Sequence, residues 1–383
     1  MTVHDDLAVC YCMTSLQGLY HDNEDRCSVA KFDGWSVNAA NSVLRLPIYQ
    51  PVEAKANLDV DAPTPKCDDQ LQCLIRGSAK TWCAQAEVSL SKGNSVEEIR
   101  RVGGLMFTIC DGHDGPEAAD LVVQELPKTL MRCWRQTNIQ HVIRTQDQIL
   151  AASARSSIKE TFVQSLFEVE ESFKRKYPVS SNEVTGETTY ACTSGSCALC
   201  TVILGNEIWC ANLGDCRAGI LFRDREGTKT GYRFTWLSRE HRIRNQDEID
   251  RVNNCGGWFS KGRLGGMLEP TRTIGDLDVK ASQPNDCLSV VPEVRMTKIE
   301  RSGLLMIATD GVWDEMNGQE VFRFLRKHKD IWSVVKNCLN QNEVVTTEQL
   351  EDLSRRIVMK ARYRGSEDDI TLICALLKPA SSL

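Results

Sequence analysis

Two apolar runs that each end in Asp-Gly constrain the fold of this chain more than any other feature. The run "GLMFTIC" leads into Asp111 and Gly112, and "GLLMIAT" leads into Asp310 and Gly311. A short apolar run bounded by turn residues is typical of a buried strand. Each run therefore predicts a buried strand that carries an acidic residue to its end.

Strands and helices alternate in blocks along the rest of the chain. Apolar residues recur at helical spacing between 156 and 177, and Thr346 with Gln349 forms a capping box before a second long helix. The stretch 197–222 predicts three strands in an antiparallel meander, with turns at 205–206 and 214–215. This block pattern favours an α+β fold in which helices cover antiparallel sheets.

Shorter signals predict element ends. A helix from Pro116 is expected to end or kink at Pro127. Ser238 is a candidate N-cap for a helix that ends before Gly256. Residues 34 to about 100 contain four prolines and few periodic apolar segments, which predicts a long insertion with a possible strand at 86–91.

Composition excludes several classes of protein. The 383 residues are 42% hydrophobic and carry a net charge of −6 with no block of Lys and Arg, so no nucleic-acid footprint is expected. No apolar run reaches the roughly 18 residues of a membrane span, and no targeting signal opens the chain. A soluble protein of the cytoplasm or nucleus is expected, without a membrane partner.

Cysteine usage points to reduced thiols. There are 17 cysteines, an odd number, in a long chain without a secretion signal. Cys197 and Cys200 form a C-x-x-C, which suits a redox or zinc site or two small buried residues of a strand. The apolar surroundings, and the lack of a second pair at zinc spacing, favour the buried strand.

Four sites place acids at a strand end or in the turn beside it: Glu24-Asp25, Asp111-Gly112, Asp310-Gly311 and Asp368-Asp369. Each alone is an ordinary turn signal, and "DNED" at 22–25 by itself favours a solvated turn. Together they predict convergent carboxylates, which repel one another unless cations lie between them. All-oxygen ligands suit Mg²⁺ or Mn²⁺, and two such ions would activate a water and neutralise a phosphoryl group.

The order of motifs resembles the metal-dependent serine/threonine protein phosphatases of type 2C. It reads "NED", "FTICDGHDG", "TSGSCALC", "LSREHR", "RTIGD", "ATDGVWDEM" and "GSEDDITLI", and spans about 15–377 of a single domain with the insertion at about 34–100. The resemblance implies two antiparallel β-sheets packed as a central sandwich and flanked by helix pairs.

The resemblance also implies roles for named residues. Two ions, Mg²⁺ or Mn²⁺, would be held by Asp25, Asp111, the carbonyl of Gly112, Asp310 and Asp368, and Glu24 would contact metal waters or one ion directly. Asp111 would bridge the ions, and the water between them would attack phosphorus. His113 would protonate the leaving oxygen. Asp314 matches a ligand of a weaker third ion, whereas Asp215 and Asp276 are expected to hold turns through bonds to backbone N–H groups.

Four positions depart from the family pattern. Tyr20 stands where an Arg usually holds the substrate phosphate. Cys192 replaces an acid that helps to bind a third ion, Cys197 replaces a Thr, and Asp369 replaces an Asn. Thiolate is a poor ligand for Mg²⁺, and Asp369 adds negative charge beside the predicted centre.

The sequence leaves more than one function open. The first is Mg²⁺- or Mn²⁺-dependent hydrolysis of phosphoserine and phosphothreonine on a phosphoprotein substrate. The second is a pseudophosphatase that binds partners on the same fold, with the 34–100 insertion as a docking surface. A minor third is an enzyme whose phosphate ester is not on a protein.

Overall fold

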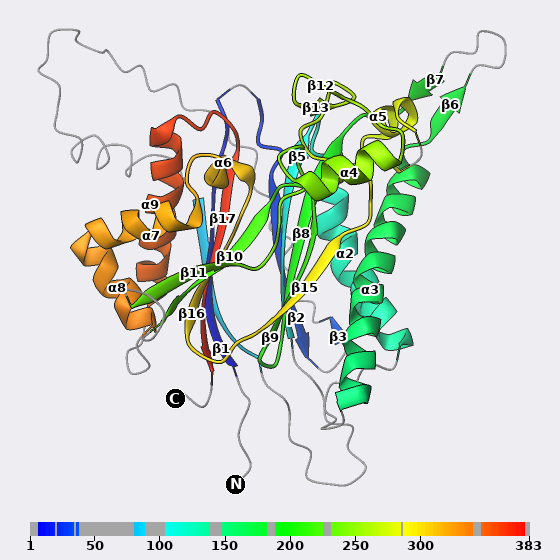
Figure 1. Cartoon of the computed structure of the whole chain (residues 1–383). Helices are drawn as coiled ribbons and strands as arrows, with labels where there is room; N and C mark the ends of the chain where they lie inside the picture. Colours follow the sequence, from blue (N-terminus) through cyan, green and yellow to red (C-terminus); the bar gives the residue numbers. More distant parts are fainter. Residues whose placement is uncertain are drawn as a thin grey trace, which may run out of the picture.

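The computed structural model describes residues 7–19, 21–33, 36–37, 80–88, 104–137, 148–181, 188–224, 231–284, 286–339 and 346–379. Two antiparallel sheets pack face to face in the centre, and helices cover their outer faces (Figure 1). This arrangement confirms the expected α+β sandwich. Along the described ranges, no helix is both long enough and apolar enough to cross a membrane.

The first sheet joins strands from both ends of the chain. β1 pairs with β17 over its whole length, with Leu7 opposite Pro379 and Leu16 opposite Ile370. In sheet order the strands are β11 (Tyr232–Trp236), β10 (Arg217–Arg223), β16 (Gly303–Ala308), β17 (Ile370–Pro379), β1 (Leu7–Leu16) and β4 (Lys80–Val88).

The second sheet has the strand that contains Asp111 and Gly112 near its centre. In order its strands are β15 (Glu293–Lys298), β9 (Glu207–Leu213), β8 (Gly195–Leu204), β5 (Gly104–His113), β2 (Arg26–Asp33) and β3 (Ser36–Val37), and β14 (Ile274–Gly275) pairs with β8. Both runs predicted as buried strands, 104–110 and 303–308, are strands whose residues are buried.

Each sheet is covered on its outer face by helices. α2 (Glu117–Gln136) and α3 (Gln148–Lys176) cover the second sheet, where Trp134 packs edge-on against Phe162. α7 (Gly318–Lys327), α8 (Lys329–Leu339) and α9 (Thr347–Arg364) cover the first sheet. The predicted capping box of Thr346 and Gln349 opens α9. Between the sheets lies a third apolar core that includes Phe107 and Ile373.

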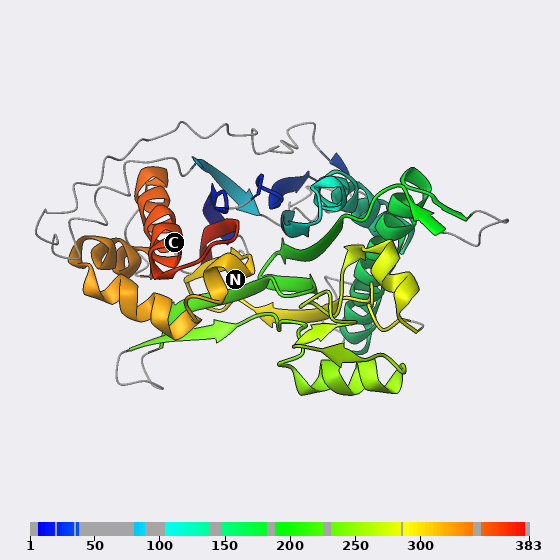
Figure 2. The same cartoon turned by 90° about the horizontal axis from the view of Figure 1, so that it is seen from above.

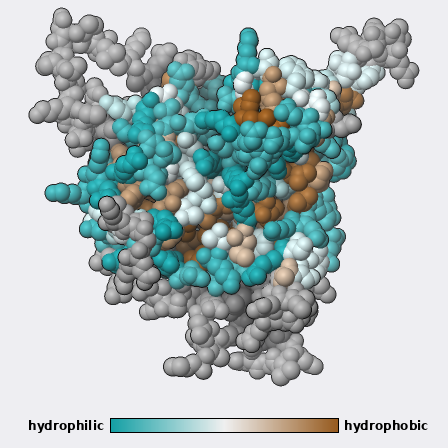
Figure 3. Space-filling model, viewed as in Figure 1, coloured by the Kyte–Doolittle hydropathy of each residue, from teal (hydrophilic) through white to brown (hydrophobic). Residues whose placement is uncertain are grey.

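The smaller elements gather at one end of the sandwich. They are α4 (Gln246–Asn254), α5 (Leu277–Ser282), α6 (Asp310–Trp313), and the hairpins β6 (Val179–Ser181) with β7 (Thr188–Tyr190) and β12 (Phe259–Ser260) with β13 (Arg263–Leu264). Seen from above, α4 and α5 lie apart from α7, α8 and α9 (Figure 2). The face in Figure 3 is mostly hydrophilic, with several small apolar patches. Trp258 and Met267, beside the β12–β13 hairpin, are exposed.

The predicted three-stranded meander is wrong at its third strand. β8 and β9 pair as expected, but β10 lies in the other sheet, between β11 and β16. The turn at Gly214-Asp215 therefore crosses from one sheet to the other. Alternation of apolar residues cannot reveal this crossing, because both sheets bury these strands equally well.

Two further expectations need correction, and a third is confirmed in part. α2 continues through Pro127 to Gln136, since the ring removes only one internal hydrogen bond of a helix that is anchored by its buried face. Ser238 is not an N-cap: α4 begins eight residues later, and the side chain of Asn245 accepts the N–H of Asp247. Within the insertion, the possible strand at 86–91 is confirmed for residues 86–88, which end β4, and residues 89–91 lie outside the described part of the chain.

Candidate metal centre

The strand register brings the predicted acids together in two pairs. Asp25 directly precedes β2 and Asp111 lies near the end of β5, and these antiparallel neighbours pair Arg26 with Cys110. Asp310 follows β16 and Asp368 precedes β17, where Ala308 pairs with Leu372. Each sheet thus delivers two acids to the same end of the sandwich (Figure 1).

Three carboxylates meet at the centre of this end. Asp111, Asp215 and Asp310 each offer an oxygen, and these atoms lie within 4.8 Å of one another. Asp215 does not hold a turn as expected, since its Oδ1 accepts the thiol of Cys197 at 3.1 Å and its Oδ2 accepts Nε of Arg242 at 2.8 Å. The sheet-to-sheet crossing before β10 places Asp215 here.

Burial and mutual repulsion disfavour charge on these acids. Burial, together with the charge of Asp369, raises the pKa of Asp25 well above its usual range. Burial and the charges of Asp310 and Asp25 do the same for the pKa of Asp111. For Asp310, burial and the charge of Asp215 raise the pKa to about 8, although Arg242 opposes the change. An added cation would relieve this repulsion.

The donor atoms fit a hard divalent cation. Among the described residues, Oδ1 of Asp25 and Oδ1 of Asp310 are buried and have no hydrogen-bond partner. A buried oxygen without a partner is costly unless an ion or a water completes it. Carboxylate oxygens from several elements are the ligands that Mg²⁺ and Mn²⁺ prefer.

Glu24 and Gly112 connect the segment before β2 with the "DGHDG" segment at the end of β5. Oε1 of Glu24 accepts the backbone N–H of Gly115 at 2.9 Å, which ties the "DGHDG" loop to the start of β2. A Cβ atom on Gly112 would lie 2.6 Å from the carbonyl oxygen of Glu24. The close approach of the two backbones therefore requires glycine at 112.

Asp368 and Asp369 have different environments. The side chain of Asp368 is half exposed, whereas that of Asp369 is buried. The carboxylate of Asp369 accepts the backbone N–H groups of Gly18 and Glu24, both at 2.6 Å. The acid that the sequence places beside the centre thus holds the backbone of Gly18 and of Glu24 in position.

His113 faces an acid that was expected to serve a turn. Its Nε2 lies 2.8 Å from Oδ1 of Asp276, and the side chain of Asp276 makes no capping bond to α5. Burial alone would lower the pKa of His113, but the charge and hydrogen bond of Asp276 outweigh it and raise the pKa above 6.5. The charge of Asp276 therefore favours the protonated form of the imidazole.

Arg242 is the largest feature that sequence reasoning missed. Its buried guanidinium donates to Asp215, to Asp310 and to both carboxylate oxygens of Asp314, the last two at 2.9 and 2.8 Å. Asp314, expected to bind a further ion, is therefore paired with a cation of the chain itself. Only the position of Arg242 inside the motif "LSREHR" signalled it.

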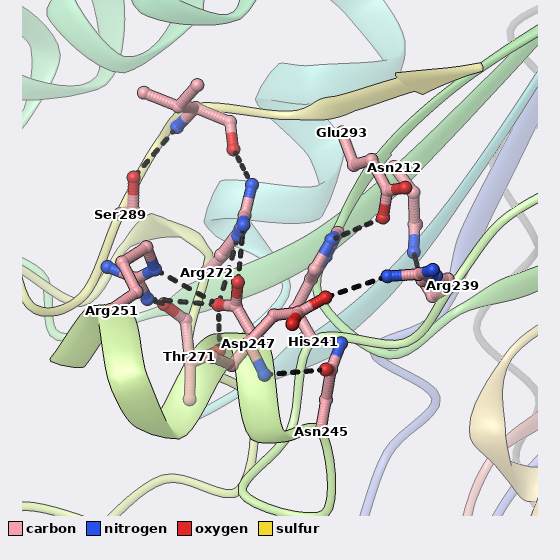
Figure 4. A network of polar contacts seen from close by, with 12 residues as sticks. Asn212, Arg239, His241, Asn245, Asp247, Arg251, Thr271, Arg272, Ser289 and Glu293 are labelled. Atoms are coloured by element: carbon pink, nitrogen blue, oxygen red, sulfur yellow. Dashed lines mark hydrogen bonds and ion pairs between the residues drawn. The ribbon is translucent and has the colours of Figure 1, made fainter.

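A buried ionic network holds the segment that carries Arg242. Glu248 of α4 accepts hydrogen bonds from Arg251, Thr271 and Arg272 around its carboxylate. Figure 4 labels these three donors. The backbone of Thr271 in turn donates to the carbonyl of His241 at 2.9 Å. These contacts fix the backbone beside Arg242 from one side.

Comparison with known proteins decides the family. The family model described as protein phosphatase 2C matches residues 90–370 of this chain. The chain belongs to the protein phosphatase 2C family. Its fold and its acid cluster agree with that membership.

Individual relatives of the 2C family are distant. Two rice proteins, probable protein phosphatase 2C 47 and probable protein phosphatase 2C 2, are 28% and 30% identical over 271 and 269 residues. Each match covers 70% of this chain, but 58% and 60% of the respective rice protein. The chain therefore matches about three-fifths of the length of these curated relatives.

One solved structure supports the fold. The structure of a C. elegans sex-determining protein is 23% identical with a TM-score of 0.51, and covers 72% of this chain and 57% of its own. At this identity the likeness concerns the fold alone.

The positions that depart from the 2C pattern have definite surroundings where they are described. Cys192 is partly buried beside α2, and Cys197 is buried on β8 with its thiol on Asp215. Cys200 is also buried on β8, which agrees with the strand interpretation of the C-x-x-C. Tyr20, at the usual phosphate-clamp position, lies outside the described residues.

Proposed function

We propose that this 2C-family chain hydrolyses phosphoserine and phosphothreonine on proteins with the help of Mg²⁺ or Mn²⁺. Two ions would bind at a site formed by Glu24, Asp25, Asp111, Gly112, Asp310 and Asp368. The observation that supports the proposal is the cluster of Asp111, Asp215 and Asp310, whose carboxylate oxygens lie within 4.8 Å of one another, with buried oxygens of Asp25 and Asp310 that have no partner among the described residues. Such a centre is expensive to maintain without a cationic ligand.

Bound divalent ions would lower the pKa of water and neutralise phosphoryl charge. The chain's own residues supply the rest. His113, held by Asp276 and favoured as imidazolium, would donate a proton from its ring to the leaving serine or threonine oxygen. Asp276 orients the ring and stabilises its charge, while the contact of Glu24 with Gly115 keeps the His113 loop against β2.

The experiment that tests this proposal compares turnover of a phosphothreonine peptide with Mn²⁺, Mg²⁺ or EDTA. We expect activity with either ion, none in EDTA, and none in Asp111→Ala. Failure of the wild-type protein to exceed Asp111→Ala in either metal would favour a pseudophosphatase. Turnover of a small phosphate ester but of no phosphopeptide would favour a substrate that is not a protein.

The remaining features stay predictions. The insertion at 34–100 is proposed as a surface for a protein partner, although most of it lies outside the described residues. Location in the cytoplasm or nucleus rests on the sequence alone.

A further inference from the structure

The acid cluster contains a cation that belongs to the chain. The side chain of Arg242 is only 2% exposed and lies among Asp215, Asp310 and Asp314, which come from the β9–β10 crossing and from both ends of α6. Its donors reach four carboxylate oxygens of these three residues. Guanidinium remains charged at any pH at which the protein is folded.

The backbone around Arg242 fixes the direction from which the guanidinium enters. His241 donates its N–H to the carbonyl of Gly214 at 2.9 Å, and the carbonyl of Arg242 accepts the N–H of Asn245 at 2.8 Å. Arg242 also forms a β-bridge with Pro270. Because this segment is held by several elements, withdrawal of the side chain would break buried hydrogen bonds as well as ion pairs.

The carboxylate oxygens divide into two sets. Oδ2 of Asp215, Oδ2 of Asp310 and both oxygens of Asp314 are used by Arg242. Oδ1 of Asp310 and Oδ1 of Asp25 are buried without a partner in the described part of the chain. A divalent ion can bind the second set directly, but at the first set it would compete with the guanidinium for the same oxygens.

We propose that the guanidinium of Arg242 is a resident cation that fills the space between Asp215, Asp310 and Asp314 and excludes a divalent ion from it. The inference rests on the proposed use of this cluster to bind divalent ions. It removes Asp314 from the expected metal ligands and assigns it to hold Arg242. It also explains how three acids remain close together on this side of the cluster without a metal.

The test counts ions rather than turnover. Mn²⁺ bound per chain is measured by equilibrium dialysis with electron paramagnetic resonance of the free ion, for the wild-type protein, Arg242→Gln, Asp314→Asn and Arg244→Gln. Arg244 is the matched control, because it is exposed and its ion pair within the described part of the chain is with Asp314, at 3.2 Å. We expect one additional Mn²⁺ per chain in Arg242→Gln, and the wild-type count in Asp314→Asn and Arg244→Gln.

Thermal unfolding gives a second readout that does not need activity. In EDTA the Tm of Arg242→Gln should fall below that of Arg244→Gln, and Mn²⁺ should raise the Tm of Arg242→Gln by more than it raises the wild-type Tm. If folded Arg242→Gln protein can be obtained only in the presence of Mn²⁺, this would also support the inference, because the metal then replaces the guanidinium.

Two results would overturn the inference: an unchanged Mn²⁺ count in Arg242→Gln, or the loss of an ion in Asp314→Asn. The second decides the matter if Arg242→Gln does not fold, since Asp314 is less than half exposed but not buried, and its change to Asn keeps the shape of the side chain. Failure of the proposed function gives a different result, because the wild-type protein and Asp111→Ala would then bind the same number of Mn²⁺ ions.

Discussion

The imidazole of His113 and the carboxylate of Asp276 are joined at 2.8 Å across 163 residues of sequence. His113 ends β5, and Asp276 lies between β14 and α5 with a positive φ of 50°. Asp and Asn adopt a left-handed backbone more readily than most residues, and the side chain of Asp276 makes no capping bond to α5. The pair couples the protonation of His113 to the segment that follows β14.

Asp276→Asn should move the basic limb of the pH–rate profile to lower pH. The charge of Asp276 raises the pKa of His113, so its removal lowers that pKa. If protonated His113 is the general acid, kcat falls as pH rises through this pKa, and the fall then begins earlier. Asn is chosen because it also adopts a left-handed backbone readily. The measurement is kcat on a phosphothreonine peptide from pH 5.5 to 9.

The control for this prediction is Asp250→Asn, an exposed acid of α4 whose side chain contacts only Gln246 among the described residues. It should leave the profile unchanged. His113→Gln should lower kcat by about 10²- to 10⁴-fold and abolish the limb. A limb that stays in place in Asp276→Asn would show that His113 is not the titrating acid.

Metal-free protein should lose stability as pH rises. Asp25, Asp111 and Asp310 have folded-state pKa values above their unfolded values, and that of Asp310 reaches about 8. The folded state therefore binds more protons than the unfolded state from about pH 4 upward, and the stability this contributes is lost as pH rises toward 8. Each such group changes the free energy of unfolding by on the order of 1 kcal/mol per pH unit.

Urea unfolding at pH 5, 6, 7 and 8 in EDTA and in Mn²⁺ checks this expectation. The stability in EDTA should decline with pH, and the difference between Mn²⁺ and EDTA should widen. Asp310→Asn should flatten the decline in EDTA. Equal slopes with and without metal would mean that the acids do not bind the ion.

Sequence reasoning found the part of the centre that follows from strand ends. Asp111, Asp310 and Asp368 border apolar runs, Asp25 lies at an expected strand end or turn, and antiparallel pairing brings such ends together. Their convergence was therefore predictable without coordinates.

The other members of the centre depend on contacts that no local pattern carries. Asp215 reaches the cluster only because β10 changes sheets, and Asp276 reaches His113 only because β14 pairs with β8. Arg242 lies in a segment with no regular secondary structure, and its partners are 27 to 72 residues away. An Asp or Arg in a turn looks the same in sequence whether its partner is backbone, water or a distant acid.

Tyr20→Arg should supply the phosphate-binding Arg that the 2C pattern usually has at this position. A charge-assisted contact of about 1.5–3 kcal/mol corresponds to roughly a 10- to 150-fold lower KM for the phosphopeptide. Leu19→Arg is the control, because Leu19 is exposed and receives the same charge one position away. Unchanged KM and kcat in Tyr20→Arg would mean that another residue holds the phosphate, or that none does.

Glu248 should determine stability at acid pH. Although burial opposes it, hydrogen bonds from Arg272 and Thr271 lower the pKa of Glu248 from 4.5 to about 2. A lowered folded-state pKa contributes stability that is present above pH 4.5 and is lost as pH falls toward 2. Glu248→Gln should therefore reduce the free energy of unfolding at pH 7 by about 3–5 kcal/mol, because it leaves Arg251 and Arg272 without their buried partner. It should also remove this loss between pH 4.5 and 2.

Asp247→Asn on the same helix, an exposed acid, should change stability by less than about 0.5 kcal/mol. Urea unfolding at pH 7, 4 and 3 measures both variants, and equal effects of the two would contradict the assignment of Glu248 as the centre of the network.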